Sequence, residues 1–107
     1  MSATVTLCTT CGAADPVPAL TARLAAEALP VAVRGHPCLN LCAAPTAMAL
    51  QGPGRASYLF HGIDPVRDAA DIAATLRLYL AAPSGWIEDA TGCGRLRDCL
   101  AGRIPPL

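Results

Sequence analysis

Ala3-Thr-Val-Thr-Leu-Cys-Thr-Thr-Cys-Gly12 is the stretch from which the fold is predicted. Residues 3–7 alternate β-branched and apolar side chains over a short run, which is typical of a strand that ends at Cys8. A turn with a second cysteine, Cys11, follows at once and leaves through Gly12. Asp15-Pro16 then marks a helix start, because Asp can cap backbone N–H groups and a proline at the first helical position has none to lose.

A helix and a second strand are predicted next. From Val17 the apolar residues return at helical spacing as far as Ala28, and Pro30 ends the pattern. Residues 31–34 have the apolar and β-branched composition of a short strand, and Gly35-His-Pro37 closes it. A strand, a helix and a strand in this order indicate a parallel pair joined by a crossover connection.

The second half of the chain predicts a hairpin and another helix. Residues 46–50 and 55–60 are predicted strands, joined by the turn Gln51-Gly-Pro-Gly54. Asp64-Pro65 repeats the cap-and-proline start, and helical apolar spacing continues to Leu80. The predicted fold class is therefore α/β and thioredoxin-like: β-α-β, then a β-hairpin and a helix, with an irregular C-terminal tail. We predict a thioredoxin-like metal- or cluster-binding domain at residues 1–85 and a C-terminal extension at residues 86–107.

The composition argues against several classes of protein. All eight basic residues are Arg, they equal the eight acidic residues in number and they form no basic stripe, so neither a nucleic acid nor a membrane is an expected partner. No segment is long and apolar enough for a membrane span, and residues 1–7 lack the charged start of a signal peptide. We therefore expect a cytoplasmic protein, where reducing conditions favour metal binding or redox chemistry at the six cysteines over disulfides.

Two cysteine pairs give the strongest functional signal. The first pair follows the first predicted strand with two residues between its members, and the second pair follows the second strand with three. Because neighbouring parallel strands end at the same edge of a sheet, the four sulfurs are expected to converge there. Four thiolates are the ligands of [2Fe–2S] clusters and also suit tetrahedral zinc. The predicted cofactor-binding and metal-binding residues are Cys8, Cys11, Cys38 and Cys42.

The two cysteine loops also have a suitable composition for a cluster. Neither contains Asp or Glu, which would add to the negative charge of an iron–sulfur centre. Thr9, Thr10 and Asn40 can shape the turns or donate to the sulfurs, and Gly12 lets the backbone approach closely.

Other interpretations of the cysteines and histidines stay open. The four thiols could be ordinary buried core residues, although two pairs that each follow a predicted strand favour a metal site. Cys93 and Cys99 could form a redox pair or a second soft metal site, or supply a replacement ligand. We favour their interpretation as tail thiols, because two cysteines alone make an incomplete metal site. His36 could replace one thiolate, as in Rieske-type centres. His61 is interpreted as structural, and Trp86 as an anchor of the tail.

Several motifs match a known family and together cover nearly the whole chain. Leu7-Cys-Thr-Thr-Cys11 and Pro37-Cys-Leu-Asn-Leu-Cys42, in this strand order, resemble the thioredoxin-like [2Fe–2S] ferredoxins. Within that group the chain is similar to the small predicted metal-binding proteins of the DUF1636 family. Two further motifs carry this likeness, a segment before the last helix, Phe60-His-Gly-Ile-Asp-Pro65, and the ending Arg103-Ile-Pro105.

The resemblance implies a thioredoxin-like fold and a [2Fe–2S] cluster on the four cysteines named above. One departure is the spacing of the first two cysteines, which is wider in many thioredoxin-like ferredoxins. Members of the small family tend to be associated with cobalamin-synthesis and cobalt-handling proteins, so the resemblance suggests a partner of that kind.

The predicted function is that of a small [2Fe–2S] ferredoxin-like protein in one-electron transfer, or of a cluster-bearing accessory protein, linked to cobalamin or cobalt metabolism. We do not expect an enzyme, since the chain has no catalytic triad, nucleotide-binding glycine motif or paired catalytic carboxylates. The expected partner is a redox or metal-handling protein, and a homodimer is left open. Two alternatives are a zinc- or cobalt-handling protein that uses the same thiolates and a thioredoxin-like thiol–disulfide oxidoreductase.

Overall fold

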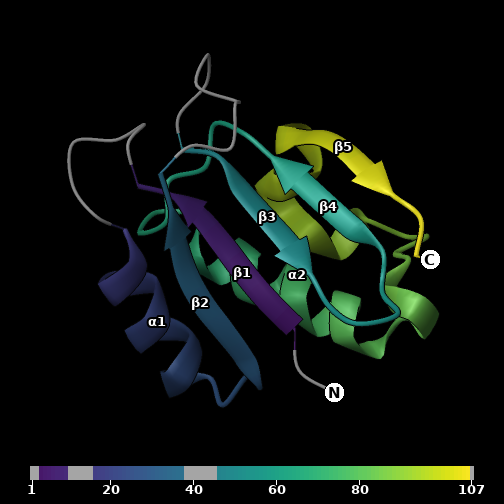
Figure 1. Ribbon diagram of the computed structural model, residues 1–107, viewed down its shortest axis with the longest axis horizontal. Helices are drawn as coiled ribbons and strands as arrows, with labels where there is room; N and C mark the ends of the chain where they lie inside the picture. The colour runs from purple at the N-terminus through teal and green to yellow at the C-terminus, as the bar shows by residue number, and fades with distance from the viewer. Residues whose placement is uncertain (1–2, 10–15, 38–45, 107) are drawn as a thin grey trace.

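The computed structural model describes residues 3–9, 16–37 and 46–106 (Figure 1). Its centre is a five-stranded sheet with the strand order β2-β1-β3-β4-β5. β1 and β2 run parallel, and the other neighbouring strands are antiparallel. The strands are β1 (Ala3–Cys8), β2 (Val31–His36), β3 (Met48–Gln51), β4 (Ser57–Phe60) and β5 (Leu100–Ile104). The predicted α/β class and the order of strand, helix, strand, hairpin and helix are thereby confirmed.

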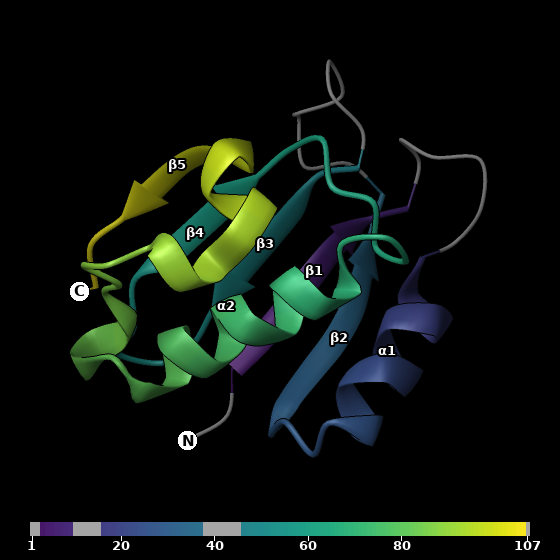
Figure 2. The ribbon, with the colours of Figure 1, turned by 180° about the vertical axis from the view of Figure 1, so that it is seen from behind.

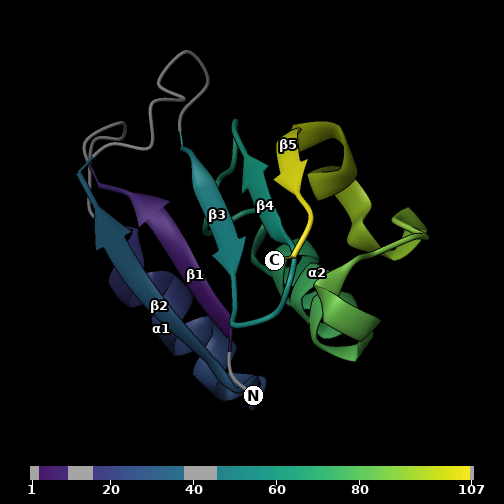
Figure 3. The ribbon, with the colours of Figure 1, turned by 45° about the vertical axis from the view of Figure 1, so that its right-hand side comes forward.

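The described helices lie on one face of this sheet. They are α1 (Val17–Ala26), α2 (Ala69–Ala81) and two 3₁₀ segments, η1 (Pro83–Gly85) and η2 (Thr91–Cys99). In Figure 3 the strands stand in front of α1 and α2, and from behind, in Figure 2, α2 and η2 stand in front of the strands. α1 and α2 also contact each other. No described helix is both long and apolar enough to cross a membrane.

We call the other side of the sheet the open face. Its side chains follow from the strand register, because partners on neighbouring strands point to the same side and alternate residues share a side. One row across the sheet consists of Arg34, Thr6, Ala49, Leu59 and Gly102, and the next row of the open face contains Ala32, Thr4, Gln51, Ser57 and Ile104.

The hydrophobic core fills the space between the sheet and the helices. Alternate residues of β1 point into it, so Val5 and Leu7 have no exposed surface. They belong to the same buried cluster as residues of both α-helices, namely Leu20, Leu24, Ile72, Leu76 and Tyr79. Met48 is fully buried in this core. Burial of each of these apolar side chains stabilises the fold by about 1.5–3 kcal/mol and fixes the helices against the sheet.

The predicted helix boundaries differ from the structure at two places. α1 ends at Ala26 rather than Ala28, because Ala28 has a left-handed φ of 55°. The N–H groups of Ala28 and Leu29 donate back to Ala25 and Leu24, as in a Schellman motif. α2 begins at Ala69, after a turn, rather than directly at the predicted Asp64-Pro65 start.

The C-terminal part is ordered rather than irregular, which corrects the expectation for the tail. η2 packs against α2, and β5 adds an antiparallel strand to β4. Cys93, Leu96 and Cys99 of η2 are buried and belong to the core. The Arg103 guanidinium lies 3.9 Å from the centre of the Trp86 ring, which agrees with Trp86 as an anchor of this segment.

Candidate cysteine site at the edge of the sheet

The first cysteine of the predicted site lies where the two parallel strands end together. In the register of β1 and β2, Cys8 is opposite His36, the last residue of β2. The backbone N–H of Thr9 donates to the His36 carbonyl at 2.9 Å, so the pairing continues just beyond the strands. The segments 10–15 and 38–45, which contain the other predicted ligands, therefore depart from neighbouring positions at one edge of the sheet.

Cys8 itself is held between the two ends of segment 38–45. Its thiol lies 3.5 Å from the carbonyl oxygen of Pro37, the residue that precedes this segment. On the other side, its backbone N–H donates to Ala47, just after the segment, at 3.0 Å. The side chain is 1% exposed. Pro37 and Ala47, the residues that flank segment 38–45 in the contacts above, thus both bond to Cys8.

Gly35 permits this close approach of the strand ends. An added Cβ at Gly35 would lie 2.5 Å from the methyl group of Thr9 and 3.4 Å from a methyl group of Val17. Real Cβ atoms do not approach side-chain carbons as closely as 2.5 Å, so a larger residue would push Thr9 away. Gly35 therefore allows Thr9, the residue directly after Cys8, to pack closely against β2.

The remaining predicted ligands, Cys11, Cys38 and Cys42, lie outside the described residues, as do Thr10, Gly12 and Asn40. Within the described ranges, no three His, Cys, Asp or Glu side chains gather in a group that could hold a metal ion. Those ranges contain one of the four predicted ligands, Cys8. The ligand assignment therefore stays a prediction, and Cys8 is its described member.

Cys93 and Cys99 lie in a different place from Cys8, on the face of η2 that is buried in the core. Burial raises the pKa of the Cys99 thiol above its usual 9.0, against the opposing effect of the nearby Arg95 charge. A thiol with a raised pKa stays protonated at neutral pH and is a poor metal ligand and nucleophile. The Cys99 sulfur lies beside Arg95 and the Gly62 carbonyl, and the interpretation of Cys93 and Cys99 as thiols outside the metal site stays a prediction. The backbone N–H of His61 donates to the Cys99 carbonyl at 2.9 Å, and a structural role of the His61 side chain stays a prediction.

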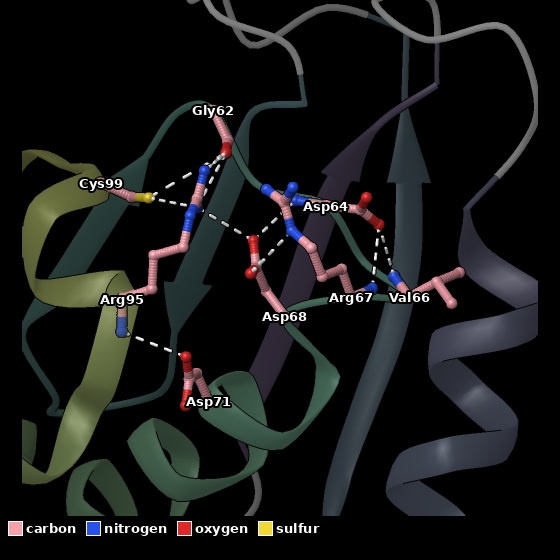
Figure 4. A network of polar contacts seen from close by, with 8 residues as sticks. All are labelled: Gly62, Asp64, Val66, Arg67, Asp68, Asp71, Arg95 and Cys99. Atoms are coloured by element: carbon pink, nitrogen blue, oxygen red, sulfur yellow. Dashed lines mark hydrogen bonds and ion pairs between the residues drawn. The ribbon is translucent and has the colours of Figure 1, made fainter.

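A polar network centred on Arg95 stands next to this edge of the sheet (Figure 4). One guanidinium nitrogen of Arg95 lies 3.0 Å from Asp68, a carboxylate that is only 3% exposed. Both terminal nitrogens donate to the Gly62 carbonyl, at 3.1 and 3.0 Å, and one lies 3.0 Å from the Cys99 sulfur. The backbone N–H of Arg95 donates to Asp71 at 3.1 Å. Arg95 therefore joins η2 to α2 and to the loop before it.

The network holds the loop that pairs with Thr46, the residue directly after segment 38–45. Gly62 precedes Ile63, which exchanges two backbone hydrogen bonds of 3.0 Å with Thr46. Thr46 is the first described residue after the segment. The Asp64 carboxylate also accepts N–H groups of the next turn, and these bonds lower its pKa below the usual 3.8. Local sequence patterns gave no sign of the Arg95–Asp68 contact, since the two residues are 27 positions apart.

A comparison with known protein families matched residues 5–106 to the family described as "Protein of unknown function (DUF1636)". Neither the curated proteins nor the solved structures gave a match. The matched range includes both cysteine pairs and the C-terminal strand β5. The likeness to this family seen in the sequence is thereby confirmed, whereas the wider grouping with thioredoxin-like ferredoxins stays a prediction.

Proposed function

The chain belongs to the DUF1636 family, and we propose that it is a ferredoxin-like protein that holds one [2Fe–2S] cluster for one-electron transfer. The observation that carries this proposal is the position of Cys8 between Pro37 and Ala47. Segment 38–45, with two cysteines, begins and ends beside Cys8, and Cys11 follows three residues later. The four predicted ligands are Cys8, Cys11, Cys38 and Cys42.

The donor set suits this group chemically. Four thiolates are the usual ligands of a [2Fe–2S] cluster, and a bound cluster would accept and return one electron at a time. The protein's own residues support the site by holding the two strand ends together. Thr9 contributes through its N–H and its hydroxyl, which both donate to the His36 carbonyl, at 2.9 and 3.3 Å.

The strand order supports the thioredoxin-like part of the proposal. A parallel β1–β2 pair, with β3 and β4 antiparallel beside β1, is the core arrangement expected of such a fold. Both α-helices cover the same face, and the cysteine-bearing segments leave from the carboxyl ends of the parallel strands. Binding sites of open α/β sheets typically occur at the carboxyl ends of strands.

A zinc- or cobalt-handling role would use the same four thiolates, and a link to cobalamin or cobalt metabolism stays a prediction. One experiment separates these roles from electron transfer: purification of the full chain without oxygen, followed by a visible spectrum and assays of iron, sulfide, zinc and cobalt. We expect two iron and two sulfide per chain and a reversible one-electron couple. A colourless protein that contains only zinc, or an apoprotein that reduces insulin disulfides, would contradict the proposal.

A further inference from the structure

The open face of the sheet is hollowed at the end where β3 turns into β4. The hollow has a volume of about 330 Å³ and is lined by Thr4, Arg34, Gln51, Gly52, Pro53 and Ser57. Small-molecule sites typically have volumes of ~300–1,000 Å³, so its size suits a small ligand. It extends from β2 across β1 and β3 to β4, which is about 14 Å at the usual strand spacing.

Among the described residues that line the hollow, Arg34 is the charged one. None of the five described strands contains Asp or Glu, and their two arginines are Arg34 and Arg103. Arg103 lies on the opposite side of the sheet, over the Trp86 ring. Arg34 is exposed, and within residues 3–9, 16–37 and 46–106 no hydrogen bond or ion pair joins its guanidinium to another side chain or to the backbone. Its charge is therefore available to an anion from solution.

The polar side chains beside Arg34 are available as well. The side chains of Thr4, Gln51 and Ser57 make no hydrogen bond to any residue that the structure describes. Together they offer two hydroxyl groups and an amide, each of which can both donate and accept. By contrast, six of the chain's eight arginines contact a carboxylate, a carbonyl or an aromatic ring. The charged and polar side chains that line this hollow are therefore open to a ligand.

We propose that this hollow binds a small polar carboxylic acid. The carboxylate pairs with the Arg34 guanidinium, whose planar fork matches two carboxylate oxygens, and the Thr4 hydroxyl donates to the same group. A second polar group of the ligand, farther along, bonds to Gln51 and Ser57. Because the two groups of the ligand contact opposite ends of the hollow, inorganic phosphate, a single compact anion, can reach only one of them. The site uses described residues alone and does not depend on the cysteine cluster.

The test is a titration of the isotopically labelled full chain followed by NMR, with succinate as the probe. We expect saturable shifts of the Arg34 side-chain N–H and of the Thr4, Gln51 and Ser57 signals. Arg34→Gln should weaken binding about tenfold or more, since hydrogen bonds to charged groups are among the strongest. Arg34→Lys should bind with intermediate affinity, because it keeps the charge but loses the fork.

The matched control is Arg97→Gln. Arg97 also makes no hydrogen bond or ion pair with a described residue, but it lies on η2, on the other side of the sheet. This variant should bind succinate as the unchanged protein does. Uncharged succinamide and inorganic phosphate should both bind more weakly than succinate. The proposal is wrong if succinate gives no saturable shift, if Arg34→Gln binds it equally well, or if succinamide or phosphate binds more tightly.

Discussion

At the scale of single residues, the site depends on how closely β2 approaches the residue after Cys8. Gly35 lies opposite Leu7 in the parallel pair, and its missing side chain makes room for the Thr9 methyl group. Thr9 in turn donates twice to the end of β2. The sequence suggested only that Gly35 closes a strand. Its contact with Thr9 joins two segments 26 positions apart in the sequence, which no local pattern could reveal.

Replacement of Gly35 by Ala should therefore destabilise the protein by about 1–3 kcal/mol, the usual cost of overpacking. The matched control is Gly102→Ala, where an added Cβ meets no atom within 4 Å. That variant should unfold within about 0.5 kcal/mol of the unchanged protein. Urea unfolding measures both effects, and equal midpoints for the two variants would show that Thr9 does not need the space at Gly35.

The lowered pKa of the Asp64 carboxylate predicts that the stability of the protein falls at acidic pH. Backbone N–H groups of Arg67 and Val66 donate to its carboxylate and lower its pKa below 3.8. The folded pKa is the lower one, so this stabilisation is complete above pH 3.8 and is lost as the pH falls through the folded value. Asp64→Asn keeps an acceptor oxygen but does not titrate. The unfolding free energy of this variant should therefore decrease less below pH 3.8 than that of the unchanged protein. If the two unfolding free energies fell in parallel with pH, the prediction would be wrong.

At the scale of elements, the C-terminal segment is where sequence analysis and structure differ most. η2 buries Cys93, Leu96 and Cys99, which are spaced by three, the period of a 3₁₀-helix. This pattern is present in the sequence, but two of its three members are cysteines and Gly94 interrupts the helical backbone with a φ of 61°. An added Cβ at Gly94 would also clash with the Asp71 carboxylate. The strands and α-helices were predictable because their apolar residues repeat over longer runs.

The Arg95 network should contribute strongly to the attachment of η2 and β5. Arg95→Ala removes the closer of the two arginines that contact the buried Asp68 carboxylate, while Arg67 at 3.7 Å and the Asp64 N–H remain. It should cost about 1–3 kcal/mol, less than the loss of a fully buried pair, because Arg95 is 41% exposed and Asp68 keeps other partners. Arg97→Ala, two residues along the same segment, is the control and should cost less than about 0.5 kcal/mol. Denaturant unfolding and hydrogen exchange of β5 measure the effect. Equal losses in both variants would contradict the role given to Arg95.

At the scale of the whole molecule, the fold brings the starts of both cysteine-bearing segments to one edge of the sheet. The sequence predicted this edge, because a β-α-β unit makes two strands parallel and the pairs of cysteines follow those strands. It did not predict that the other side of the sheet would carry no helix among the described residues, since the alternation within strands does not identify what covers each face. The open face is therefore a finding of the structure.

A cluster that joins the two segments should also stabilise the whole chain, because it binds the folded protein and not the unfolded one. We expect the loaded form to melt roughly 10 °C or more above the empty form. Calorimetry of preparations with measured iron content gives the comparison. Identical melting temperatures for loaded and empty protein would mean that the bound group does not tie the two segments together.

The most direct test of the central claim is the iron and sulfide content of six single Cys→Ser variants, purified without oxygen. Cys8→Ser, Cys11→Ser, Cys38→Ser and Cys42→Ser should each lose most of the cluster absorbance, because each removes one of four thiolate ligands. Cys93→Ser and Cys99→Ser should keep it, as buried thiols under η2. A Cys99 variant that loses the cluster while a Cys11 variant keeps it would contradict the account.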